Sequence, residues 1–147
     1  MTKSGNFQFS LIAALIAQVI WVGSANATGA LAVGVAPGGA QHGFSYGVVW
    51  DASTAATAQT TAMSKCQTSK ESNPPAQARC TLVGTFTNQC SAIAMDPATG
   101  TPGIGWAIAA DTAAANKQAL ANCEATAGPG RTGFCRVSSI HCDGSGK

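Results

Sequence analysis

The sequence predicts an α+β fold in which a strand–strand–helix–strand unit occurs twice. The stretches "AATAQTTAMSKC" (55–66) and "AAANKQALANC" (113–123) both read as alanine-rich helices that end on a cysteine. On either side of each helix, apolar residues alternate with small or polar ones, as they do in half-buried strands. We therefore expect an antiparallel sheet with two alanine-rich helices packed on it and crosslinked by disulfides.

The elements of the first unit follow in order. Residues 31–35 alternate large and small side chains, and "PGGAQHG" (37–43) has the composition of a turn. In the next strand, 44–50, Phe44, Tyr46, Val48 and Trp50 fall on one face. Ser53 or Thr54 is the expected cap of the first helix, and 81–87 is the third strand.

The second unit has the same order. Ile93 and Met95 mark a strand, and "DPATGTPG" (96–103) is a turn. The strand that follows carries Ile104, Trp106 and Ile108 on one face, and we expect Trp106, like Trp50 in the first unit, to lie in the core. Asp111 is the expected cap of the second helix. The segment "GPGRTG" (128–133) matches a dinucleotide-binding glycine pattern, but it follows a helix and precedes a strand, so we expect a turn.

Residues 1–27 have the features of a signal peptide. Lys3 precedes an apolar run, 9–23, and Ala25 and Ala27 provide the small residues of a cleavage site. The run is about 15 residues, shorter than the roughly 20 that span a bilayer. We expect cleavage after Ala27, export to the periplasm or the outside of the cell, and no stable membrane insertion afterwards. An uncleaved anchor is the alternative.

The remaining residues, 28–147, suit one domain, with halves of about 28–90 and 91–147. Although 46% of the whole chain is hydrophobic, alanine supplies most of this fraction. Only 10% of residues are charged, and no run of basic residues occurs. Nucleic acid is therefore not an expected partner.

Six cysteines lie in this domain, and an even number in an exported chain predicts three disulfides. A metal site is the alternative, but there is no C-x-x-C. Spacing alone leaves the pairing open. Each half carries three cysteines in corresponding places, and this symmetry favours the pairs Cys66–Cys80, Cys123–Cys135 and Cys90–Cys142, the last of which would join the halves.

The segments "ALAVGVAPGG", "AMSKC", "CTLVGTFTNQCSAIAMD", "GWAIAADTAAANKQALANC" and "CRVSSIHC" resemble the bacterial domain of unknown function 4189 family. The resemblance covers essentially all of residues 28–147, and the cysteine pattern is its most specific part. It implies export and the fold described above. It implies no activity and no catalytic residue.

One motif points to catalysis. "GFSYG" (43–47) matches the G-x-S-x-G pattern of serine hydrolases, and Ser45 with Asp96 or Asp111 and then His141 gives the order of a catalytic triad. The pattern requires a sharp turn from a strand into a helix. Ser45 instead lies within an alternating strand, and its counterpart in the second half is close to Gly103, so we expect a strand residue that faces small neighbours.

The other titratable residues form no evident site. His42 and His141 are the two histidines of the chain, and no third metal ligand follows from their spacing. The acidic residues are dispersed. We expect no cofactor and no metal.

These observations favour an exported, disulfide-stabilised binding module over an enzyme. Loops on a rigid scaffold commonly carry recognition, so we expect the turns "APGGAQHGFS" (36–45) and "DPATGTPGIG" (96–105) to form the binding surface for another envelope or secreted protein, for example as an inhibitor or immunity-type partner of a secreted enzyme. The alternatives are a small serine hydrolase using Ser45 and an envelope structural component.

Overall fold

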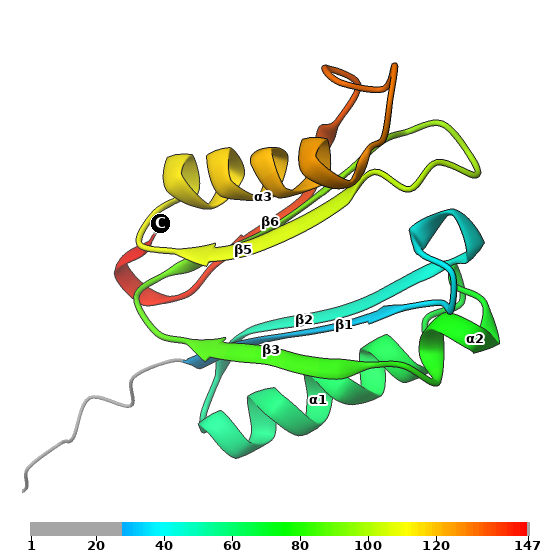
Figure 1. The fold of residues 1–147 in the computed structure, drawn as a ribbon. Helices are drawn as coiled ribbons and strands as arrows, with labels where there is room; N and C mark the ends of the chain where they lie inside the picture. The colour runs from blue at the N-terminus through cyan, green and yellow to red at the C-terminus, as the bar shows by residue number, and fades with distance from the viewer. Residues whose placement is uncertain (1–27, 147) are drawn as a thin grey trace, which may run out of the picture.

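The computed structural model describes residues 28–146, in which four layers are stacked (Figure 1). A helix forms each outer layer, and two antiparallel sheets of three strands lie between the helices. The signal peptide and cleavage site expected over residues 1–27 lie outside the described residues. The strands are β1 (Thr28–Val35), β2 (Phe44–Ala52), β3 (Thr81–Phe86), β4 (Cys90–Met95), β5 (Ile104–Ala109) and β6 (Arg136–Cys142). The helices are α1 (Ala55–Gln67), α2 (Pro74–Gln77) and α3 (Thr112–Thr126), with short 3-10 turns η1 (Ala40–His42) and η2 (Gly144–Gly146).

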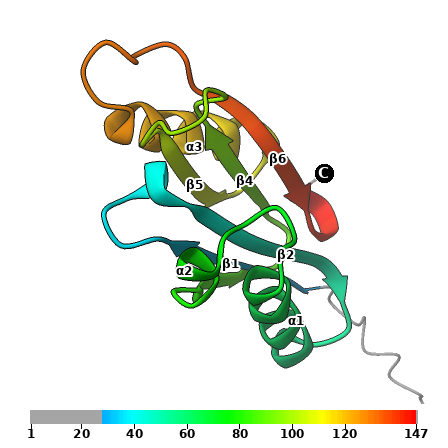
Figure 2. The ribbon, with the colours of Figure 1, turned by 90° about the vertical axis from the view of Figure 1, so that its right-hand side faces the viewer.

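The two sheets have the same strand order, with the first strand of each half in the middle. The orders are β2-β1-β3 and β5-β4-β6. The α+β class, the antiparallel strands and the two alanine-rich helices are confirmed. The strands form two sheets where the sequence analysis expects one, and the turned view shows the two layers (Figure 2). The three residues between β3 and β4 carry the chain from one layer into the other (Figure 1).

Residue size decides which face of each sheet meets which layer. In β1, Ala30 and Ala32 pack on α1, whereas Leu31 and Val33 pack between the sheets. In β4, alanines likewise pack on α3 and Ile93 packs between the sheets. Small side chains admit a helix at close range, and the larger ones supply most of the apolar area buried at the centre.

Both long helices begin at a side-chain cap and bury a row of small residues. Thr54 accepts a hydrogen bond from the Thr57 amide (3.1 Å), and Asp111 accepts one from the Ala114 amide (2.8 Å). The buried rows are Ala58, Ala62 and Cys66 in α1, and Ala115, Ala119 and Cys123 in α3. A Cβ on Gly47 would overlap the Ala62 carbonyl oxygen, and one on Gly105 would overlap that of Ala119. Glycine is required where each helix crosses its sheet.

The described residues contain three disulfides, and they are the pairs that symmetry favours. Cys66–Cys80 and Cys123–Cys135 connect the C-terminal part of each helix to the strand that follows, closing separations of 14 and 12 residues. Such crosslinks stabilise a fold mainly by restricting the unfolded chain, by about 3 kcal/mol for loops of this length.

The third disulfide corrects one expectation. The sequence analysis expects Cys90–Cys142 to join the halves, but Cys90 is the first residue of β4 and pairs with Cys142 directly across β4 and β6. The bond therefore lies within the second sheet and does not join the halves. The two sheets are held together by apolar packing instead.

Within residues 28–146, no helix combines the length and apolarity needed to cross a membrane.

Candidate binding groove

The two turns expected to form a binding surface lie at one end of the molecule and line a common groove. One cavity of about 490 Å³ is bounded by Gly38, Gly39, Ala40 and Gln41 from the first turn and by Pro102 and Ile104 from the second. An adjoining cavity of about 360 Å³ lies between β5 and the C-terminal part of α3. Both contain Ile104, Trp106 and Thr126, and we call the two together the turn-end groove.

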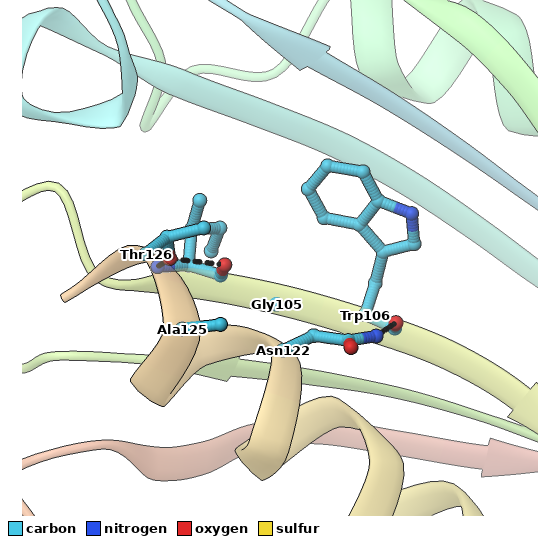
Figure 3. Close-up of a pocket in the computed structure, with 6 residues that line it drawn as sticks. Gly105, Trp106, Asn122, Ala125 and Thr126 are labelled. Carbon is cyan, nitrogen blue, oxygen red and sulfur yellow. Dashed lines mark hydrogen bonds between the residues drawn. The ribbon is translucent and has the colours of Figure 1, made fainter.

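Trp106 forms the centre of the groove. Its side chain rises from β5 toward the first sheet (Figure 3) and is half-buried. Its ring stacks on Phe44 of β2, with 6.0 Å between centroids and 16° between planes, and Phe44 stacks in turn on Tyr46. The indole is thus held by the opposite sheet while part of its surface stays open.

Side chains of α3 close the free edge of β5 beside the indole. The Thr126 hydroxyl accepts a hydrogen bond from the Ile104 amide (2.9 Å) and lies 2.7 Å from the Ile104 carbonyl oxygen. The Asn122 amide donates to the Trp106 carbonyl (2.8 Å), as Figure 3 shows. Because these backbone groups already have partners, this stretch of β5 does not offer its edge to an incoming strand.

An ion pair holds the second turn in place. The Arg131 guanidinium makes two contacts with the Asp96 carboxylate, at 2.7 and 2.5 Å, and the Ala98 amide donates to the same carboxylate at 3.0 Å. The hydrogen bonds from Arg131 lower the pKa of Asp96, although burial of the carboxylate opposes them. Asp96 is therefore a structural anion at the base of the turn.

Among residues 28–146, no charged side chain lines either cavity. The walls are apolar side chains and glycine, with the polar groups of Gln41, Asn122 and Thr126 at the border. A phosphate or carboxylate ligand would lose its hydration there without gaining a counter-ion, so the chemistry of the groove favours an uncharged, apolar ligand group.

The residues of the candidate triad lie in different layers. Ser45 is 1% exposed beneath α1, and its hydroxyl donates to the Cys66 carbonyl (2.5 Å). Asp111 caps α3, and the ring of His141 stacks on Trp50. Asp96 is engaged by Arg131. The counterpart of Ser45 is Gly103, because Gly47 and Gly105 occupy the same place beneath their helices and Ser45 and Gly103 each lie two residues earlier.

The histidines also lie apart. His42 is exposed in η1, and His141 is on β6. No group of three or more potential metal-binding side chains lies together within the described part of the chain.

Trp50 is not the core residue that the sequence analysis expects. It is 40% exposed and stacks on His141 with 3.8 Å between ring centroids, while the Lys65 ammonium lies 5.6 Å from its centroid. Partial burial and the Lys65 charge lower the pKa of His141. The end of β2 bends here, since Asp51 has a positive φ of 57°, and alternation in the sequence gives no signal of that bend.

Asn122 and Thr126 were missed by the sequence analysis. They are four residues apart on α3, a spacing that places two polar side chains on one helical face, and this was the available signal.

Comparison with known proteins gives one match. The model of the family described as Domain of unknown function (DUF4189) matches residues 20–142, so the resemblance noted in the sequence is confirmed. No curated protein and no solved structure matches the chain.

Proposed function

The chain belongs to the DUF4189 family, and we propose that it is an exported binding module whose turn-end groove receives apolar side chains from another envelope or secreted protein. The observation that carries this proposal is the convergence of two turns, 36–45 and 96–105, on one uncharged groove around Trp106. The three disulfides are typical of proteins that work in an oxidising compartment outside the cytoplasm.

The size and chemistry of the groove support a peptide side chain as the ligand group. Ligand cavities are commonly apolar, with a few polar groups that orient the ligand, and the volumes here lie in the ordinary range for such sites. The half-buried indole offers the kind of aromatic surface that dominates many protein interfaces. Since α3 closes the edge of β5, recognition would proceed through side chains and not through strand addition.

A concrete form of this proposal is an inhibitor or immunity-type partner of a secreted enzyme. Such a partner needs a rigid surface that does not open during binding. The disulfides Cys66–Cys80 and Cys123–Cys135 and the Asp96–Arg131 ion pair provide that rigidity near the groove.

The test uses a matched pair of variants on α3. Ala125 lines the groove, whereas Ala121, one turn earlier, does not, and both are exposed. The Ala125→Arg protein places a charge and a large side chain at the groove, and the Ala121→Arg protein places the same group outside it.

Binding is measured with a library of extended peptides rich in apolar residues and with crosslinking to proteins of the cell envelope. The fluorescence of Trp106 reports peptide binding in a Trp50→Phe background. We expect Ala125→Arg to weaken binding at least tenfold and Ala121→Arg to leave it unchanged. Equal affinity of both variants for every captured ligand would remove the groove as the binding site.

A further inference from the structure

Asp143, outside the groove, is a buried carboxylate with an incomplete set of partners. The residue is fully buried, and its Oδ1 accepts a hydrogen bond from the Asp51 amide at 3.0 Å. Its Oδ2 is buried and has no hydrogen-bond partner in the described structure. A buried anionic oxygen without a donor or counter-ion is costly, so this site calls for a cation.

The position of Asp143 indicates which cation is near. Its amide donates to the Gln89 carbonyl (2.9 Å), and its carboxylate binds the Asp51 amide. Asp143 therefore bridges the end of β2 and the connection that follows β3. In the order β2-β1-β3, the strand between these two points is β1.

Thr28, the first residue of β1, lies between the two chain segments that bind Asp143. It pairs with Ala52, which follows Asp51, and its hydroxyl lies 3.4 Å from that of Thr87, two residues before Gln89. The start of β1 and the C-terminal segment lie at the same end of the molecule in both ribbon views (Figures 1 and 2).

We propose that Asp143 forms an ammonium-binding site whose ligand is the α-amino group that signal-peptide cleavage would create at Thr28. This inference rests on the predicted cleavage after Ala27 and is independent of the groove. In the uncleaved chain the Thr28 nitrogen is an uncharged amide. Cleavage of the Ala27–Thr28 peptide bond by water releases the signal peptide as a carboxylate and leaves a protonated amine at Thr28, so the buried anion gains its counter-ion only on maturation.

Other ionisable groups around this end are few. Asp51 at the end of β2 is exposed, His141 and Lys65 lie against Trp50, and the β3–β4 connection, 87–89, carries none. Asp111 at the start of α3 precedes Thr112, whose hydroxyl lies 3.3 Å from Cys142 Sγ, and the Asp111 carboxylate accepts a hydrogen bond from the Ala114 amide. Lys147 is the other cation that the sequence places close to Asp143. It serves as the competing counter-ion in the experiment.

The first measurement is the pKa of the α-amino group in exported protein whose N-terminus has been identified by mass spectrometry. Reductive methylation with ¹³C-formaldehyde preserves the charge and allows an NMR titration of the terminal dimethylamine. We expect this pKa to exceed the ordinary value by about one unit because of the nearby carboxylate, and to return to that value in Asp143→Asn. Glu71→Gln, which removes an exposed carboxylate elsewhere, and Lys147→Gln leave it raised.

The proposal is overturned if the exported chain does not begin at Thr28, if Asp143→Asn leaves the amine pKa unchanged, or if Lys147→Gln abolishes the effect. A second measurement does not depend on the folding of Asp143→Asn. Acetylation of the Thr28 amine, or a chain beginning at Ala27, should lower the Tm by roughly 5 °C. An unchanged Tm in the acetylated protein also overturns the proposal.

Discussion

The two halves of the molecule differ most in the connection between the helix and the third strand. In the first half this connection contains α2 and covers the beginning of β2. Ser72 donates to the Phe44 carbonyl (2.8 Å), and Asn73 donates to the His42 carbonyl (2.5 Å). In the second half, residues 127–135 contain no helix. The beginning of β5 is instead bonded by Thr126 of α3 itself, and the groove opens beside it.

This difference shows that the same arrangement of strands and helix can leave the start of its second strand either covered or beside an open groove. The layers are the same in both halves, down to the glycine at which each helix crosses its sheet. Only the connection changes, and it determines whether the start of the second strand is covered or lies beside an open apolar surface. The two halves share the layers and differ in these connections.

The largest loss of stability is expected at the glycines where each helix crosses its sheet, a feature that both halves share. Gly47→Ala and Gly105→Ala should each lower the free energy of unfolding by about 3 kcal/mol, because the new Cβ forces α1 or α3 away from its sheet. Gly84→Ala is the control, since its Cβ would lie at an ordinary 3.5 Å from Ile108 Cδ1 and should change stability by less than about 1 kcal/mol. Chemical denaturation measures all three. A large loss of stability in only one of the two variants would show that the two helix–sheet contacts are not equivalent.

The next largest loss of stability is expected from an ion pair that only the second half contains among the described residues. Asp96 anchors its turn through Arg131, whereas the corresponding residue of the first half is Gly34, which has no side chain to form such a contact. The folded state lowers the pKa of Asp96, so the carboxylate contributes stability above the ordinary carboxyl pKa of 3.8. That contribution is lost as the pH falls through the lowered pKa of the folded state.

Asp96→Asn should therefore reduce the Tm at neutral pH and weaken binding at the groove. The difference from the unmodified protein should shrink as the pH falls below 3.8. Thermal unfolding followed from neutral to acidic pH tests this. A difference that is constant over the whole range would mean that the ionised carboxylate is not the source of the stability.

A smaller loss of stability is expected when the hydroxyl that bonds the start of β2 or the start of β5 is removed. Ser72→Ala and Thr126→Val each remove a hydroxyl that bonds the first residue of a strand, and each should cost about 1 kcal/mol of stability. Only Thr126→Val should also alter peptide affinity, since Thr126 lines the groove and Ser72 does not. The pair is measured by denaturation and by peptide titration in parallel. Loss of affinity in Ser72→Ala would indicate that the covered end also takes part in binding.

The smallest effect concerns His141, whose pKa is lowered by burial and by Lys65. Protonation is disfavoured in the folded protein, so stability falls as the pH drops below the ordinary value of 6.5 and becomes constant below the folded pKa. Lys65→Gln should raise the pKa of His141 toward 6.5, as an NMR titration of the imidazole would measure. A pKa unaffected by this change would assign the shift to burial alone.

Much of the candidate site was predictable because its turns are rich in glycine and proline. Segments 36–45 and 96–105 were identified as surface loops from composition. Their meeting in one groove was not predictable, since it depends on how the two sheets stack. The partners of Ser45 and Asp96 were equally hidden, because local pattern says nothing about which carbonyl or guanidinium lies opposite a side chain.

The sequence by itself determined the two long helices, their caps and the order of the strands along the chain, because 3.6-residue and two-residue periodicities are local properties of the chain. It also indicated three disulfides, since the cysteines recur at matching places in both halves. It did not indicate the short helix α2, which lies in a stretch with the composition of a loop. Tertiary structure decided that the strands form two sheets, with the large side chains Leu31, Val33 and Ile93 packed between them. It also decided that Cys90 faces Cys142 within one sheet and that the half-buried Trp106 ring stacks on Phe44 at the groove. These outcomes depend on which faces pack together, and packing between faces is a long-range property that no window of sequence contains.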